Sequence, residues 1–242
     1  MGFLYRNQLH PAAMETIPVA LRLAFGLSTA LAVWLFYRAA HRSGWVLAVL
    51  LPWLLIQGAA AGSGFYTVTS NTLPPRLALV LGPPMLAIVL LLLTGRGRRF
   101  VDGLRLETLT LLHVVRIPVE LVLFGLYLHQ AVPRLMTFEG RNWDILTGLT
   151  APVVYYLAFR RKQLGRSGLL IWNVVGLALL LNIVVNAVLA VPGPLQRQAF
   201  DQPNGAVLHF PFAWLPGVVV PLALLAHLAA IRRLLRAPLT SE

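Results

Sequence analysis

The chain has 242 residues, of which 58% are hydrophobic and only 12% are charged, about half the charged share of soluble domains. Such a composition excludes an ordinary soluble domain and predicts one integral membrane domain over residues 1–242. The net charge of +12 is explained by arginine at membrane edges rather than by a nucleic-acid partner, and the absence of cysteine excludes disulfides and thiolate sites.

Seven apolar segments follow one another along the chain, each close to the length of about 17 to 25 residues that a transmembrane helix needs. The fifth segment is the shortest, and it needs Trp143 and Asp144 at its outer end to cross the bilayer. We therefore predict an all-α polytopic transmembrane helical bundle with seven spans. The spans lie near residues 17–37, 44–61, 76–94, 106–132, 143–159, 169–191 and 212–231.

The distribution of arginine and lysine predicts the orientation of the bundle, since cytoplasmic loops are enriched in both residues. Five of them fall on one face, at Arg6, Arg76, Arg134, Arg141 and Arg197. Thirteen fall on the other face, at Arg38, Arg42, Arg96, Arg98, Arg99, Arg105, Arg160, Arg161, Lys162, Arg166, Arg232, Arg233 and Arg236. We expect a multi-pass protein with its N-terminus outside and its C-terminus in the cytoplasm.

The loops on the predicted outer face are long and chemically mixed, as in "PRLMTFEGRNWD" and "PGPLQRQAFDQPNGAVLHFP". Ordinary solvated loops are one interpretation, in which Asp144 stabilises a helix start and Glu139 pairs with Arg141 across a turn. The other is that these two loops, with Glu139, Arg141, Asp201 and His209, form the mouth of an outward-facing site.

A polar stripe lies inside the fourth span, in "LHVVRIPVELVLFGLYLHQ". His113, Arg116 and Glu120 are three and four residues apart, so they share one helix face. Charges at this depth are costly and normally face the bundle interior with a partner, and Arg116 is a local partner for Glu120. The stripe is either a structural ion pair or the floor of a ligand site or proton path.

The sixth span carries Asn182 and Asn186 on one helix face, in the outer half of the membrane. Asparagines at such positions often form hydrogen bonds between helices. The alternative is that they bind a polar ligand beneath the outer loops.

No cofactor is predicted. The histidines show no metal-binding motif, because no two are spaced like zinc ligands on one helix. A site assembled from different helices, with His113, Glu120 and His227 as ligands, is the weaker alternative.

The run from residue 109 to residue 156, with "LNIVVNAVLA", "AFDQPN" and "FPFAWLPGVVVPLALLAHL" further along, resembles a family of uncharacterised bacterial seven-helix inner-membrane proteins. The resemblance covers most of the chain. It implies the seven-span topology and location in a bacterial inner (cytoplasmic) membrane, and it implies no activity.

Three classes of function are compatible with these features. The leading hypothesis is an outward-facing polar pocket that binds a small polar or amphipathic ligand for transport or sensing, built from Glu120, Arg116, His113, Asn182, Asn186 and the outer loops. The second is an intramembrane enzyme acting on a lipid-type substrate, with or without a metal, whose catalytic residues the sequence does not identify. The third is a structural subunit of a membrane complex. The expected partners are the lipid bilayer and a small molecule, and a homo-oligomer is compatible with all three.

Overall fold

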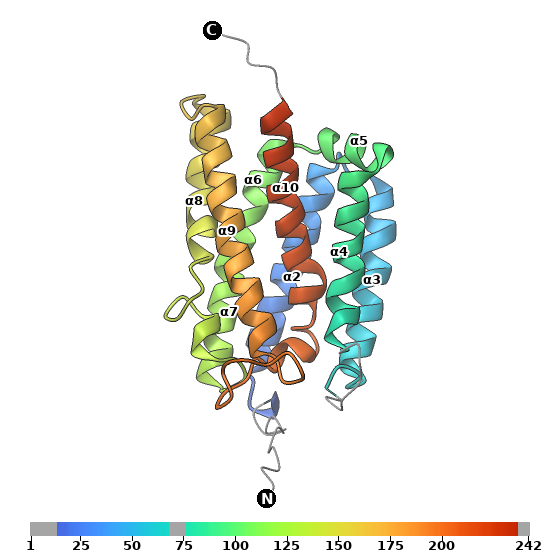
Figure 1. The fold of residues 1–242 in the computed structure, drawn as a ribbon, viewed down its shortest axis with the longest axis vertical. Coiled ribbons are helices and arrows are strands. Elements are labelled where there is room, and N and C mark those ends of the chain that lie inside the picture. Colours follow the sequence, from blue (N-terminus) through green and yellow to red (C-terminus); the bar gives the residue numbers. More distant parts are fainter. Residues whose placement is uncertain (1–13, 68–75, 237–242) are drawn as a thin grey trace, which may run out of the picture.

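The computed structural model describes residues 14–67 and 76–236, and every regular element within these ranges is helical. The long helices run along one bundle axis, with the start of α2 at one end and the end of α10 at the other (Figure 1). In chain order they are α2 (Val19–Ala39), α3 (Gly44–Gly62), α4 (Leu77–Leu93), α5 (Gly95–Gly103), α6 (Leu106–Leu112), η1 (His113–Val115), α7 (Arg116–Leu128), η2 (Arg134–Met136), α8 (Ile145–Tyr155), η3 (Tyr156–Arg160), α9 (Arg166–Ala190), η4 (Ala206–Leu208), η5 (Leu215–Val219) and α10 (Val220–Arg236).

Five helices of the described ranges are long and apolar enough to cross a membrane. They are α2, α3, the continuous stretch α6–η1–α7, α9, and η5–α10. A sixth candidate combines α4 and α5, which meet at 93°. The stretch α8–η3 is apolar but shorter. Each of the seven predicted segments thus overlaps a helix, and five or six helices satisfy length and composition.

The fourth and seventh predicted segments differ most from the structure. The fourth segment was expected to reach residue 132, but its helix ends at Leu128, where Gln130 adopts a φ of 58° and the backbone turns back on itself. The seventh was expected over 212–231, whereas the helical stretch begins at Leu215 and continues through the basic residues to Arg236. Charged side chains at the end of a span can extend the helix into the interface, which hydropathy alone does not detect.

Helix α5 was not expected, because its sequence "GRGRRFVDG" has no apolar stripe of useful length. Thr94 begins the helix, since its hydroxyl accepts a hydrogen bond from the Gly97 backbone N–H at 3.1 Å. Gly97 allows the sharp bend from α4, because a Cβ there would lie 2.5 Å from the backbone of Leu91. Helix α5 therefore lies across one end of the bundle (Figure 1).

The stretches α6–η1–α7 and η5–α10 form the centre of the bundle, and in each of them 61% of the most apolar 18-residue segment is buried. Helix α3 lies at the edge and has 17% buried. Its attachment to the centre includes two indole hydrogen bonds, from Trp53 to the Gly217 carbonyl at 2.8 Å and from Trp214 to the Leu54 carbonyl at 3.0 Å. The α3–α4 side of the molecule is thus less tightly packed than the side that carries α7, α8 and α9.

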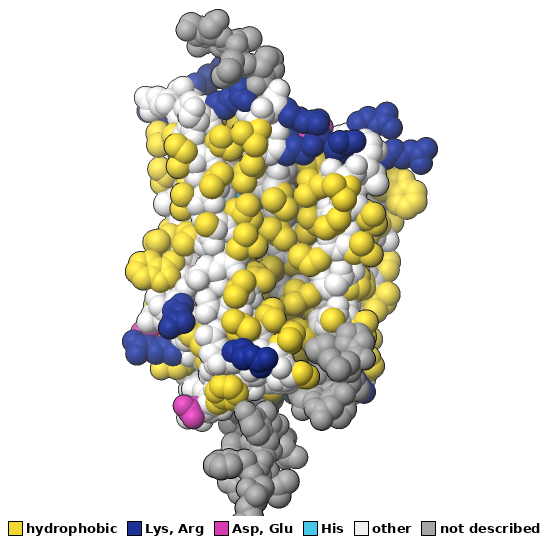
Figure 2. All heavy atoms as spheres, in the orientation of Figure 1, with side chains coloured by type: hydrophobic (Ala, Val, Ile, Leu, Met, Phe, Trp, Pro, Cys, Tyr) yellow, Lys and Arg dark blue, Asp and Glu magenta, His cyan; other side chains and the backbone are white. Residues whose placement is uncertain are grey.

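The two ends of the bundle differ in charge. Lys and Arg side chains gather at the end where α10 finishes and α5 lies, and a belt of apolar side chains separates them from the other end (Figure 2). At the basic end Asp102 of α5 accepts hydrogen bonds from Arg232 at 2.7 and 3.0 Å and from Arg236 at 3.1 Å. These contacts hold α5 against α10.

The segment from Val191 to Trp214 covers the opposite end. Its Asn204 N–H donates to the Ala190 carbonyl at 2.9 Å, and Gln202 donates to the Val132 carbonyl at 2.6 Å. Asn204 is fully buried, as are Ala206, Val207 and Leu208 of η4. This loop therefore packs onto the bundle end as an ordered cover.

Candidate functional site

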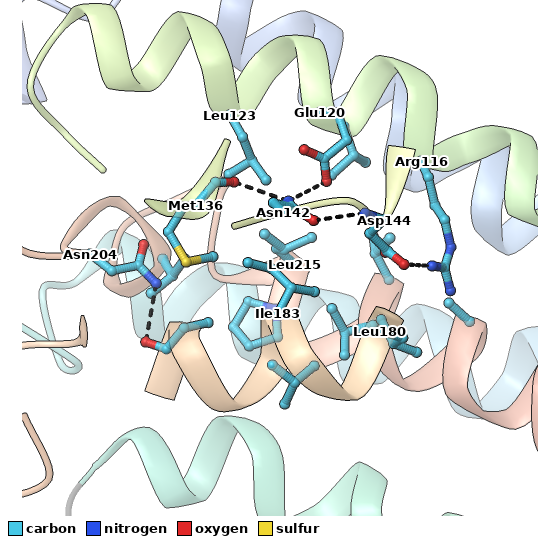
Figure 3. A pocket seen from close by; sticks show the side chains of 18 of the residues that line it. Arg116, Glu120, Leu123, Met136, Asn142, Asp144, Leu180, Ile183, Asn204 and Leu215 are labelled. Carbon is cyan, nitrogen blue, oxygen red and sulfur yellow. Dashed lines mark hydrogen bonds and ion pairs between the residues drawn. The ribbon is translucent and has the colours of Figure 1, made fainter. Parts of the chain in front are cut away.

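A cavity of about 80 Å³ lies beneath that cover, between α4, α7, α9 and η5–α10. One wall is polar and consists of Arg116, Glu120, Asn142 and Asp144, which Figure 3 shows on α7 and the segment leading into α8. The other walls are formed mainly by leucine, isoleucine and valine side chains, with Asn204 at the covered end. A volume of this size is enough for a few water molecules or a small group of atoms. The lining suits a molecule that is polar at one end only.

Arg116 and Asp144 form a buried ion pair at one end of the polar wall. Their side chains are only 6% and 7% exposed. Asp144 precedes the first turn of α8, yet its carboxylate makes no capping hydrogen bond and turns to the guanidinium of Arg116 instead. Gly148 permits this approach of α8 to α7, because a Cβ there would lie 3.1 Å from the Cβ of Arg116.

Glu120 has a different partner from the one predicted. Its Oε1 accepts a hydrogen bond from the Asn142 side chain at 2.5 Å, and the same amide donates to the Met136 carbonyl at 3.0 Å (Figure 3). The Asn142 Oδ1 accepts from the Asp144 backbone N–H at 3.2 Å. The expected Arg116–Glu120 ion pair is therefore replaced by Arg116–Asp144, because the segment before α8 enters the bundle and supplies both Asn142 and Asp144.

Behind the ion pair, Arg116 also contacts His227 of α10, with its Nη2 3.2 Å from the His227 Nε2. An arginine can only donate, so Nε2 must carry the lone pair. The Nδ1 of His227 lies 3.0 Å from the Asn173 Oδ1, whose amide nitrogen donates to the Leu169 carbonyl. These constraints assign a neutral imidazole with its proton on Nδ1, fixed between α7 and α9.

His113 stacks on His227, with ring centroids 3.9 Å apart and an angle of 16° between the planes. Trp172 lies beside both rings, with its ring centroid 5.5 Å from that of His113 and 6.0 Å from that of His227. Gly176 makes room for the second ring, since a Cβ there would lie 2.6 Å from the His227 Cε1. Arg116, His227 and Asn173 thus link three helices through one chain of polar contacts.

Several buried polar atoms of this cluster have no hydrogen-bond partner among the described residues. They are Glu120 Oε2, Arg116 Nε and both ring nitrogens of His113. Buried polar atoms are nearly always paired in folded proteins, and exceptions call for an explanation such as a ligand or ordered water. Glu120 Oε2 and Arg116 Nε belong to residues that line the cavity, so the polar wall has unused hydrogen-bonding capacity.

The structure brings three of the predicted site residues together, namely His113, Arg116 and Glu120, and buries all of them. Asn182 and Asn186 do not line the cavity. Asn182 is exposed and donates to the Arg141 carbonyl at 3.0 Å, while Asn186 donates to the Asn182 carbonyl at 2.8 Å. These bonds join α9 to the loop before α8 and lie within α9 itself, so neither is the expected bond between two helices.

The loop residues predicted at the mouth also lie outside the lining. The Glu139 carboxylate lies 3.9 Å from the guanidinium of Arg134 rather than pairing with Arg141. The side chains of Arg134 and Glu139 are 65% and 43% exposed. Asp201 is exposed, and the cavity lining includes neither it nor His209. Burial, followed by the charge of Arg22, lowers the pKa of His209. Of the segment from Val191 to Trp214 that covers this end, Val191, Asn204 and Val207 line the cavity.

The weaker metal-site hypothesis does not fit the geometry. Within the described residues no group of three or more histidine and acidic side chains is arranged to hold a metal ion. His113 and His227 lie face to face, so their ring nitrogens do not converge on a common point, and Glu120, the third proposed ligand, accepts a hydrogen bond from Asn142.

Sequence reasoning missed Asn142 as a site residue and gave Asp144 a helix-capping role. Both lie in a stretch that resembles an ordinary loop. One signal was available, since "NWD" stands immediately before an apolar helix too short to cross without it. Asn173 was visible as a polar residue in the sixth span, but nothing in the sequence connects it to His227, 54 residues away.

Residues 72–235 match the model of a protein family that is described as a domain of unknown function (DUF8737). No curated protein and no solved structure matches the chain. The matched residues extend from just before α4 almost to the end of α10, and they include every residue that lines the cavity. Since the match covers more than half of the 242 residues, the chain belongs to the DUF8737 family.

Proposed function

We propose that this protein binds an amphipathic molecule with a small, positively charged, hydrogen-bond-donating head group, for transport across the membrane or for sensing. The observation that carries the proposal is the position of Glu120, a buried carboxylate with one oxygen unpaired among the described residues, in the polar wall of a mainly apolar cavity. Pockets that combine apolar walls with a few placed polar groups are typical ligand sites.

The charge balance of the polar wall selects the sign of the head group. Arg116 is neutralised by Asp144 in the ion pair, and His227 is held in a neutral form by its two neighbours. Among the described residues, Glu120 has only the amide of Asn142 as a hydrogen-bond partner. A cationic head group at Glu120 Oε2 would supply the missing charge and a hydrogen-bond donor.

The surroundings of the cavity favour entry from the outer half of the bilayer. Leu77 and Leu81 of α4 line one side and Val184 and Val188 of α9 line another, and all four are half-buried. In the described structure α4 and α9 make at most slight contact with each other. An amphipathic molecule could pass between them with its apolar part in lipid and its head group directed at Glu120.

We further propose seven membrane crossings, in which α4 and α8–η3 also span, with the N-terminus outside and the C-terminus inside a bacterial inner membrane. The gathering of basic side chains at the α5–α10 end supports this orientation. The α4 helix, which bends sharply into α5, can cross by tilting or by local thinning of the bilayer. Local thinning also allows the short stretch α8–η3 to cross. The cavity would then face outward.

The proposal is tested with three probes of equal chain length: hexylamine, hexanol and hexanoate. The melting temperature of the purified protein in detergent is measured with each probe. Hexylamine should raise it most, because a ligand at ten times its Kd stabilises the folded state by about 1.4 kcal/mol. Equal shifts with all three probes, or none, would refute the proposed head-group chemistry.

A matched pair of variants locates the effect. Glu120→Gln keeps an acceptor for Asn142 but removes the negative charge, so it should abolish the preference for hexylamine over hexanol. Glu139→Gln removes the same charge from a loop position that is 43% exposed, and it should leave the preference intact. Loss in both variants would mean that hexylamine responds to overall charge and not to the cavity.

A further inference from the structure

A second and larger hollow lies at the opposite end of the molecule, between α3 and α4 on one side and the end of α2 and α10 on the other. Its volume of about 730 Å³ falls within the range of about 300 to 1,000 Å³ that small-molecule sites occupy. Its walls are almost entirely apolar, with Phe36, Trp53 and Leu222 among them. We call this hollow the α3–α4 crevice.

The crevice exists because the facing helices carry residues that do not fill the gap. Pro52 lies on α3, Pro83 and Pro84 on α4, and Gly217 and Pro221 on the η5–α10 side. Trp53 fastens α3 to η5 through the carbonyl of Gly217. The other half of α3, towards Trp45, stands away from the centre, and Trp45 is 79% exposed.

Helix α5 lies at the basic mouth of the crevice, which Thr94, Gly97 and Phe100 help to line. Three arginines of this segment, Arg96, Arg98 and Arg99, are exposed, and none has an acidic or hydrogen-bonding partner among residues 14–67 and 76–236. The one acidic residue of α5, Asp102, is engaged by Arg232 and Arg236 of α10. The mouth therefore combines a surplus of positive charge with an apolar interior.

We propose that the α3–α4 crevice is a binding site for one anionic phospholipid, whose acyl chains lie between the helices and whose phosphate contacts Arg96, Arg98 and Arg99. Charge complementarity identifies the occupant. Basic pockets between helices at a membrane surface bind anionic lipid head groups, and each arginine near the surface strengthens the binding about fivefold. A zwitterionic lipid would match the apolar walls but not the three unpaired arginines. This site is separate from the Glu120 cavity and does not depend on the function proposed for it.

The test is native mass spectrometry of the full-length protein, released from detergent that contains equimolar dioleoyl-phosphatidylglycerol and dioleoyl-phosphatidylcholine. The wild type should retain one phosphatidylglycerol molecule, with a preference over phosphatidylcholine of about tenfold or more. Equal retention of the two lipids would overturn the proposal. Excess glycerol phosphate should not displace the lipid, and displacement would indicate an anion site that needs no acyl chain.

Two sets of variants separate head group from chain. The triple variant Arg96→Gln/Arg98→Gln/Arg99→Gln should lose the preference for phosphatidylglycerol. The matched control is Arg160→Gln/Arg161→Gln/Lys162→Gln, which removes three positive charges at the same end of the bundle but away from the crevice, and it should keep the preference. An equal loss in both would show that the lipid responds only to net charge.

The acyl-chain part is tested by filling the crevice while the arginines remain. Ala87→Phe places a ring in the lining of α4, and Val49→Phe does the same from α3. Both positions are exposed, on the surface that faces the crevice or the lipid, so folding should be preserved. A circular-dichroism spectrum of each variant checks this. Either folded variant should reduce the retained phosphatidylglycerol severalfold. Unchanged retention in both would overturn the placement of the chains.

Discussion

Two ion pairs of the same chemistry lie at different depths in this protein. Arg116 and Asp144 are each less than a tenth exposed, whereas Asp102 is about one-third exposed and is shared by Arg232 and Arg236. The inner pair has one cation and one anion in fixed positions, with His227 and Asn142 in contact. In the outer group Asp102 is accessible to water, and it contacts a second arginine, Arg236, in addition to Arg232.

The difference shows what burial does to a charge. Within the bundle each charged group depends on one particular neighbour, because no solvent can replace that neighbour if it is lost. At the bundle end the attraction between the same groups is weakened by water and salt. Loss of a charge from the inner pair should therefore lower the free energy of unfolding strongly. Loss of a charge from the outer pair should lower it only slightly.

The largest effect is expected from Asp144→Ala, which leaves the Arg116 guanidinium buried without a counter-charge. Removing one partner of a buried pair costs about 3–5 kcal/mol. The free energy of unfolding, measured by titration with denaturing detergent and followed by circular dichroism, should fall by that amount. The double variant Arg116→Met/Asp144→Leu removes both charges and should recover most of the loss. A loss no larger than that of Asp102→Ala would contradict the comparison.

A smaller effect is expected from Gly176→Ala, which adds a methyl group without changing any charge. The new Cβ would lie 2.6 Å from the Cε1 and 2.9 Å from the Nε2 of His227, so the ring must move away from Arg116. Overpacking of this kind costs about 1–3 kcal/mol in the free energy of unfolding. The control is Gly26→Ala, also within a helix, where the added Cβ has no neighbour within 4 Å. If the two variants unfold at the same detergent concentration, the inner cluster is less rigid than the contacts indicate.

The smallest effect is expected from Asp102→Asn, at about 0–1 kcal/mol in the free energy of unfolding. The hydrogen bond from Arg232, opposed by partial desolvation and aided by the charges of Arg232 and Arg236, lowers the pKa of Asp102. A carboxylate with a lowered pKa stabilises the folded state fully above its ordinary pKa, and this contribution disappears as the pH falls through the lowered value.

The pH dependence gives this last prediction its own control. The wild type should exceed Asp102→Asn in stability by a constant amount near neutral pH, and the difference should shrink only at pH values below the ordinary range of aspartate. Unfolding titrations at a series of pH values measure it. A difference that persists at the acidic limit would show that the Asn side chain, and not the missing charge, is responsible.

The positions of the helices could be predicted from the sequence, because hydropathy reports directly on the segments that avoid water. Leu77–Leu93 and Gly44–Gly62 lie within one or two residues of their expected ranges. Helix α5 could not be predicted in this way. Its arginines and glycines have no hydropathic signal, and its order depends on Asp102 meeting Arg232, 130 residues further along the chain.

The candidate site could be predicted only in part. Spacing within one helix placed His113, Arg116 and Glu120 on a common face, and their burial follows from the cost of exposing them to lipid. The choice of partner did not follow, because a nearby residue on the same helix, Glu120, seemed to satisfy Arg116. The structure shows Asp144 instead, because the segment before α8 enters the bundle and brings this carboxylate to Arg116.

The separation of Arg116 and Asp144 along the chain has a consequence for how the protein is made. The two residues are 28 positions apart, so at about 5–20 residues per second Asp144 leaves the ribosome about 1 to 6 s after Arg116. The stretch α6–η1–α7 and helix α8 can then pack together early, with these two charges already neutralising each other. Asp102 must wait for Arg232, which is 130 residues away and needs about 6 to 26 s. The buried Arg116–Asp144 pair would thus form early in synthesis. The more exposed Asp102–Arg232 pair would form only after α10 has been synthesised.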